Sequence, residues 1–265
     1  MSDWLINLPV VWMAVVMLLL TYLLTAAIYM VVTRLAVGER ARAFKGVSAA
    51  ILSPLAVLFA LLVGFLAAQV WSDADRSRTA VNQEASSLRA VVLLAAAFPG
   101  APETRLRELV RDHIANAVTK EWPAMASHNA TLTLTSPPLA EALRTTLALD
   151  TKTAGQATAQ REIVVALDDA LAARRQRIIL SQSVVNWVKW TALILEATLT
   201  LLAIAMVHSD NRVTNRIVLT IYATASGVAL ILIASHSRPF SGEISTRPTV
   251  MLQVMPDSVS TTAQP

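Results

Sequence analysis

A single acidic residue inside a long apolar run is the first candidate for chemistry in this chain. Glu196 lies in the segment TALILEATLTLLAIAM, residues 191–206, which contains no other charged residue. A carboxylate at the centre of a membrane helix disfavours insertion by about 3 kcal/mol on insertion scales. The neighbouring leucines and isoleucines offset this cost, so the segment can still cross a membrane.

Two interpretations of Glu196 are open, and they differ in its protonation. Thr200 follows Glu196 by four residues and shares its helix face, and Thr224 lies at a similar depth in another apolar run. A protonated Glu196 would hydrogen-bond to such a hydroxyl group and fix how two helices pack. An ionised Glu196 would instead line a water-filled cavity or pore.

The remaining polar residues do not form a catalytic or metal-binding pattern. None of the four histidines has a carboxylate or a second histidine three or four residues away, which is the spacing of a helical metal site. The chain has no cysteine, and its seven glycines form neither a phosphate-binding loop nor a nucleophile elbow. We therefore expect a protein that is not an enzyme and holds no cofactor or metal. A basic face with interleaved aromatics is also missing, which argues against nucleic-acid binding.

Four long apolar runs determine the predicted class of protein. The chain of 265 residues is 55% hydrophobic and 15% charged, and its apolar residues are concentrated in these runs. A hydrocarbon layer of about 30 Å requires roughly 20 apolar residues in a helix. The predicted spans are residues 8–33, 47–71, 187–207 and 217–235. The sequence thus predicts an integral membrane protein in contact with the lipid bilayer.

The segment between the two pairs of spans, residues 72–186, predicts a helical domain outside the membrane. Its first helix, capped at Ser72 or Asp73, has an apolar face that includes Val81, Ala85 and Leu88. The fold class is therefore all-α, with four transmembrane helices in two pairs and an intervening helical extramembrane domain.

Prolines predict the remaining helix boundaries. FPGAP (98–102) ends the first helix, Pro123 ends the second at Trp122, and Pro137 opens a short third helix. A long helix from Gln156 is expected to run directly into the third span. Residues 236–265 are expected to be extended and then disordered over the last fifteen residues.

Charge in the short loops predicts an orientation in the cell (inner) membrane. The loop 34–46 has four basic residues and the loop 208–216 has two, which by the positive-inside rule places both loops in the cytoplasm. Both termini and the helical domain would then be extracytoplasmic. Arginines at the opposite membrane face, among them Arg76 and Arg174, favour the reverse, so the orientation is a preference only.

Three motifs together resemble a known family. They are WSDADRSRTAVNQEASSLRAVVLLAAAFPG (71–100), KEWPAMA (120–126) and SRPFSGEISTRP (237–248). The trio resembles the bacterial membrane protein family of unknown function with a bestrophin-like domain, over residues 50–250. The motif residues are Glu84, Glu121, Trp122, Pro123, Arg238, Pro239, Phe240, Ser241 and Gly242.

The resemblance implies kinship with bestrophins, which are pentameric anion channels with a pore neck on the second span. The segment LFALLVGFLAAQVW (58–71) is similar to that neck, which makes Phe59, Gly64 and Phe65 the pore candidates. It implies a homo-oligomer that conducts an inorganic anion. The chain has no acidic cluster like the calcium clasp of animal bestrophins. Bestrophin kinship would also place the helical domain in the cytoplasm, against the loop charges.

Two hypotheses for function follow. In the first, the chain is a subunit of an oligomeric ion channel, and Phe59 and Phe65 form an apolar constriction that gates by wetting. In the second, it is a membrane-anchored sensor or scaffold whose helical domain binds an envelope partner through an exposed face between Arg105 and His113. Glu196 would then only fix helix packing. Proton-coupled transport through Glu196 is a third, less favoured hypothesis.

Overall fold

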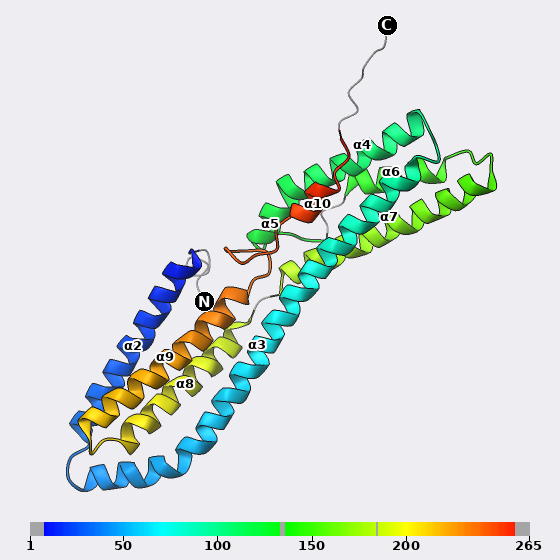
Figure 1. The fold of residues 1–265 in the computed structure, drawn as a ribbon. Helices are drawn as coiled ribbons and strands as arrows, with labels where there is room; N and C mark the ends of the chain where they lie inside the picture. Colours follow the sequence, from blue (N-terminus) through cyan, green and yellow to red (C-terminus); the bar gives the residue numbers. More distant parts are fainter. Residues whose placement is uncertain (1–7, 133–135, 184, 258–265) are drawn as a thin grey trace. The chain divides into compact units, whose positions relative to one another are not determined.

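The computed structural model describes residues 8–132, 136–183 and 185–257, and it contains helices and no strands within these ranges (Figure 1). The predicted all-α class is therefore confirmed. The chain divides into two compact units. The first, here called the membrane unit, comprises Met1–Ser72, Val184–Arg238 and Gly242–Ile244. The second, the helical unit, comprises Asp73–Ser183, Pro239–Ser241 and Ser245–Pro265.

Four helices are long and apolar enough to cross a membrane, which confirms the predicted number of spans. They are α2 (Val10–Leu35), α3 (Glu39–Ala95), α8 (Trp187–Val207) and α9 (Arg212–His236). Helix α3 has 57 residues and is not interrupted at Ser72 or Asp73, so the predicted new cap there was wrong. The reason is local, because no glycine or proline occurs between residues 65 and 95. The chain is a multi-pass membrane protein.

In the membrane unit, α2 packs along α9, and both contact α8 (Figure 1). The close approach of α2 and α9 depends on Gly227, where an added Cβ would lie 2.8 Å from Cδ2 of Leu18. Ala223 is fully buried on the same face of α9, whereas Thr220 and Thr224 are exposed. Small residues at Ala223 and Gly227 therefore allow the two helices to approach closely, and Thr224 adds a hydrogen bond between its hydroxyl and that of Tyr22 on α2.

The helical unit combines the second half of α3 with several shorter helices. These are α4 (Ala101–Asn116), the π-helical turn η1 (Ala117–Glu121), α5 (Trp122–Ala126), α6 (Pro137–Leu147), α7 (Ala154–Ser181) and α10 (Thr249–Gln253). Helix α6 packs against both α4 and α7. The predicted apolar face of α3 is confirmed, since Val81, Ala85 and Leu88 are at most 1% exposed in the core of this unit.

The second predicted helix boundary was wrong. The chain does not leave the helix at Trp122, whose φ and ψ of −59° and −49° are helical. The backbone N–H of Trp122 bonds to the carbonyl of Ala117, five residues earlier, so the turn before the proline is widened. Pro123 lies in the first turn of α5, where its missing N–H leaves no helical hydrogen bond unmade.

The helix from residue 154 ends at Ser181 and does not run into the third span as predicted. The side chain of Gln182 instead donates to the carbonyl of Ala130 at 2.7 Å. Asn186 then starts α8 as its N-cap, accepting from the backbone N–H of Lys189 at 3.0 Å. The capping asparagine provides the local reason for a new helix start.

The disorder predicted for the last fifteen residues was wrong for the part that the structure describes. Residues 249–253 form α10, and Met251 is completely buried in the core of the helical unit. Residues 258–265 lie outside the described residues. A buried methionine therefore attaches the C-terminal segment to this core.

We predict that Gly227→Leu destabilises the membrane unit, because its side chain would collide with Leu18 on α2. Overpacking of this kind costs about 1–3 kcal/mol. Thermal unfolding of the purified protein in detergent would show this as a lower midpoint. Gly64→Ala is the matched control: a Cβ at Gly64 meets no atom within 4 Å, so its midpoint should not fall. Equal midpoints for both variants would contradict the close contact.

Candidate functional site

Five charged or titratable side chains from separate parts of the helical unit meet in its interior. They form the buried charge network, defined as Glu84, His113, Glu121, Arg174 and Arg177. They come from α3, α4, η1 and α7, and none is more than 6% exposed. Burial of charges is costly unless every charge is paired and hydrogen-bonded. The stability of the network therefore depends on whether its hydrogen bonds pair every charge.

Arg177 occupies the centre of the network and binds both carboxylates. Its Nε donates to Oε2 of Glu84 at 2.7 Å, and its Nη2 donates to Oε1 of Glu84 at 3.1 Å and to Oε2 of Glu121 at 2.8 Å. Arg174 binds the other oxygen of Glu121. Its Nε and Nη2 donate to Oε1 at 2.8 and 2.7 Å. Two guanidiniums thus balance two carboxylates, and each carboxylate receives a two-pronged arginine contact.

His113 extends the network toward a neutral hydroxyl group. Its Nε2 lies 2.9 Å from Oε1 of Glu84, and its Nδ1 lies 2.8 Å from Oγ of Ser136. Because an ionised carboxylate can only accept, Nε2 carries a proton. Helical spacing offers His113 no charged partner three or four residues away. Its actual partner is 29 residues distant and could not be found by helical spacing.

The electrostatics of the network keep Glu84 ionised. Burial alone would raise the pKa of Glu84, but the charge of Arg177 and hydrogen bonds from His113 and Arg177 outweigh it and lower the pKa from 4.5 to about 2. Burial alone would lower the pKa of Arg177, and the opposing charge of Glu84 raises it instead. Glu84 is therefore ionised near neutral pH.

Trp122 connects the charge network to the C-terminal motif. The guanidinium carbon of Arg177 lies 4.5 Å from the centroid of the Trp122 ring, which is cation–π geometry. Phe240 meets the same ring edge-on, with centroids 6.1 Å apart and planes at 80°. Ser241 donates from its Oγ to the carbonyl of Ala126 at 2.6 Å. The three motifs of the sequence, far apart along the chain, therefore meet in one interior.

Other predicted motif residues have backbone or packing roles. The carbonyl of Pro239 accepts a hydrogen bond from the backbone N–H of Thr246 at 2.7 Å. Gly242 has a φ of +83°, a backbone conformation that favours glycine. Arg238 is 8% exposed, so the structure does not show the headgroup-facing arginine that is typical of a helix end.

The structure places the pore candidates of α3 on two different faces. Phe59 is 8% exposed and packs against Tyr222 of α9, with ring centroids 5.8 Å apart. Phe65 is 72% exposed, and no atom lies near a Cβ built at Gly64. Six residues along a helix rotate a side chain by about 240°. One α3 helix therefore does not bring Phe59 and Phe65 to a common surface.

Glu196 does not form the hydrogen bonds that the sequence suggested. Its Oε1 is buried and has no hydrogen-bond partner among the described residues. Thr200 is fully buried, but its hydroxyl donates to the backbone carbonyl of Glu196 at 2.9 Å. The hydroxyl of Thr224 instead lies 2.8 Å from the Tyr22 hydroxyl. Neither threonine forms a hydrogen bond with the carboxyl group in the described structure, and both interpretations of Glu196 stay open.

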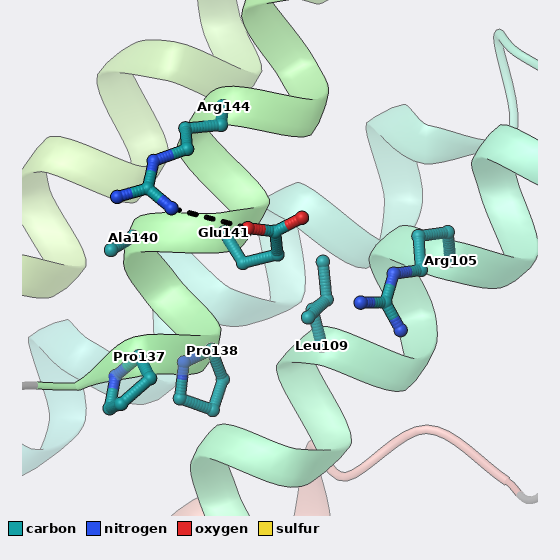
Figure 2. A pocket seen from close by; sticks show the side chains of 7 residues that line it. All are labelled: Arg105, Leu109, Pro137, Pro138, Ala140, Glu141 and Arg144. Carbon is teal, nitrogen blue, oxygen red and sulfur yellow. Dashed lines mark hydrogen bonds and ion pairs between the residues drawn. The ribbon is translucent and has the colours of Figure 1, made fainter.

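A groove on the helical unit lies between α4 and α6 and encloses about 600 Å³ (Figure 2). Leu109, Pro137 and Pro138 provide apolar walls. Arg105 and Arg144 lie at its rim, and Arg144 forms an ion pair with Glu141 at 3.5 Å. The scaffold hypothesis predicted an exposed face between Arg105 and His113. This was correct for Arg105 and wrong for His113, which is completely buried.

We predict that Glu84→Gln lowers the free energy of unfolding by about 3–5 kcal/mol, because it leaves the buried guanidinium of Arg177 partly uncompensated. Denaturant unfolding followed by circular dichroism measures this change. Glu141→Gln removes an exposed carboxylate from a pair on the same unit and should cost less than about 1 kcal/mol. Similar losses in the two variants would show that burial of the network is energetically unimportant.

We also predict a specific loss of stability in acid. The pKa of Glu84 is about 2 in the folded protein and 4.5 in the reference state, so ionised Glu84 stabilises the fold above pH 4.5. This contribution is lost as the pH falls from 4.5 to 2. Unfolding midpoints between pH 7 and pH 2 would reveal it. A Glu84→Gln variant that folds should show a weaker dependence in this window, and an unchanged dependence would contradict the assignment.

Comparison with known proteins identifies one family for this chain. A search of curated proteins and a search of solved structures found no match. A family model described as the Bestrophin-like domain matches residues 19–251, which include all four spans from the middle of α2 onward and the whole buried charge network. The chain therefore belongs to the bestrophin-like family.

Proposed function

We propose that the chain is a subunit of a homo-oligomeric anion channel whose pore is lined by α3. Membership of the bestrophin-like family supports this proposal. The fold supports it as well, because the chain supplies a compact set of four candidate spans and a separate helical unit. A single chain leaves α3 unusually uncovered, and this is the observation on which the proposal rests.

The exposed side of α3 is an apolar stripe. Only 11% of its most apolar stretch is buried, against 44% for α8. Ile51, Leu58, Leu61 and Phe65 follow each other at helical spacing and are 41–72% exposed. In an oligomer with α3 helices around a common axis, this stripe would face the axis. Phe65, the largest and most exposed of the four, would form the narrowest apolar ring.

Phe59 has a supporting role in this proposal. It lies on the buried side of α3 with Leu66 and Val70, packed against the rest of the membrane unit. Its ring contact with Tyr222 connects α3 to α9. The constriction that the sequence assigned jointly to both phenylalanines is therefore assigned to Phe65, and Phe59 holds the rotation of the helix that presents it.

Basic residues near the ends of the spans favour anions over cations as the conducted ion. Arg34 lies at the end of α2 and Arg40 at the start of α3. Arg212 and Arg216 lie at the start of α9, and Arg76 follows the span of α3. Clusters of one charge raise the local concentration of the opposite ion. Under the positive-inside rule, the arginines of the two short loops favour an orientation with the helical unit outside, and this orientation in the inner membrane is part of the proposal.

We predict that Phe65→Ala increases chloride flux severalfold through the purified protein reconstituted in liposomes, because a smaller side chain lowers the barrier to wetting. Leu20→Ala is the matched control. It removes a similarly exposed apolar side chain from α2, which is 57% exposed, and should leave the flux unchanged.

The same assay tests Glu196. An unchanged flux in Glu196→Gln would support a protonated packing residue, and an altered flux would support a carboxyl group that contacts the conducting path. Absence of chloride flux in the wild type and in Phe65→Ala, with both proteins folded, would contradict the channel proposal.

A membrane-anchored sensor or scaffold is the second candidate, and the groove of Figure 2 favours it. The prolines and Leu109 offer an apolar surface, and a second hollow that shares Glu141 and Arg144 continues it along α6. Such a surface fits an extended segment of an envelope partner. In that case the spans would only anchor the helical unit, and no variant of α3 would change conductance.

A further inference from the structure

A further hollow in the helical unit, separate from the groove between α4 and α6 and its continuation along α6, has a different chemistry. It lies between α3 and the chain segment that leads into α10, and it encloses about 320 Å³. Its lining residues are Arg78, Val81, Asn82, Ser245, Thr246, Arg247, Thr249 and Val250. This set, here called the two-arginine pocket, contains two guanidiniums, three hydroxyl groups and one carboxamide, and no carboxylate.

Within the described ranges, Arg78 and Arg247 lack the glutamate partner that Arg105, Arg107 and Arg144 have. Arg105 and Arg144, at the groove of Figure 2, each lie within 4 Å of a glutamate. In the part of the chain that the structure describes, the side chains of Arg78 and Arg247 form no ion pair and no hydrogen bond. Two like charges at one hollow repel each other, and a bound anion would relieve that repulsion.

One wall of the pocket is held rigidly by the core. The backbone N–H of Thr246 donates to Pro239 at 2.7 Å, and its carbonyl accepts from Nε1 of Trp122 at 3.1 Å. Both backbone groups of Thr246 are thus used, and its hydroxyl forms no hydrogen bond within the described structure. Trp122 itself stacks on Arg177 of the buried charge network. The wall is therefore organised before any ligand binds, which reduces the cost of binding.

We propose that the two-arginine pocket binds a phosphate group. Arginine forks match the geometry of phosphate oxygens, and hydroxyl and carboxamide groups supply further donors. Its volume is at the lower limit for ligand pockets, which suits a phosphate group with a small substituent. The phosphate has two possible sources. Arg78 lies two helical turns beyond Trp71 in α3, and tryptophan is typical of the headgroup level, so one source is an anionic lipid. The other is free inorganic phosphate.

The first arm of the test uses inorganic phosphate and the full chain in detergent. Phosphate, compared with chloride at equal ionic strength, should raise the thermal unfolding midpoint of the wild type. Arg78→Gln and Arg247→Gln should each need at least about tenfold more phosphate for the same shift, as expected for the loss of a charged hydrogen bond. Arg144→Gln, an exposed arginine paired with Glu141, should behave as the wild type. All three sites are exposed, so their midpoints in chloride should be unchanged.

The second arm uses nanodiscs of phosphatidylcholine with or without phosphatidylglycerol, and native mass spectrometry counts the retained lipids. Phosphatidylglycerol retained by the wild type and by Arg144→Gln, and lost from Arg78→Gln and Arg247→Gln, would identify a lipid headgroup as the source. A response to inorganic phosphate alone would identify the free anion. The proposal is overturned if neither ligand binds, or if both bind equally well to the variants of Arg78 and Arg247. None of these results depends on chloride flux, so the pocket is tested independently of the channel.

Discussion

The helical unit depends on one buried cation that cannot be neutralised. The guanidinium of Arg177 is completely buried, and its charge has to be balanced where it lies. Glu84 and Glu121 provide that balance, and Arg174 and His113 in turn satisfy their remaining oxygen positions. Since these residues come from α3, α4, η1 and α7, the compensation of one charge also defines how these elements are arranged.

The same cation orders elements that carry no charge of the network. The Trp122 ring lies against Arg177 and also packs against the Phe240 ring in a T-shaped arrangement. Aromatic packing therefore attaches the C-terminal motif to the interior. The π-helical turn before Pro123 places Glu121 and Trp122 next to each other on this site. Every carboxylate of the network is paired with an arginine. Through Trp122, the network also connects to the wall of the two-arginine pocket.

The membrane unit is organised by a different constraint. Lipid tails are as apolar as the side chains, so helices associate where small residues allow close contact, as at Gly227 and Ala223. This packing covers α8 and α9 more fully than α3. The uncovered stripe with Phe65 is consequently the part of the unit that is available to lipid or to further subunits. Among the described residues of this unit, Oε1 of Glu196 is buried without a hydrogen-bond partner, as are Oδ1 of Asn215 and the Tyr222 hydroxyl.

The sequence by itself determined the features that depend on local composition. The four spans, the apolar face of α3 and the starts of α4 and α6 followed from the length, periodicity and proline positions of short segments. Only the tertiary structure decided that Glu84 meets Arg177 across 93 residues, that the helix continues past Trp122, and that α7 ends before α8. It also decided which face of α3 is covered, since Phe59 is buried and Phe65 is exposed. The physical reason is that partners of a buried charge, or of a helix face, are chosen by packing between distant segments, which periodicity does not encode.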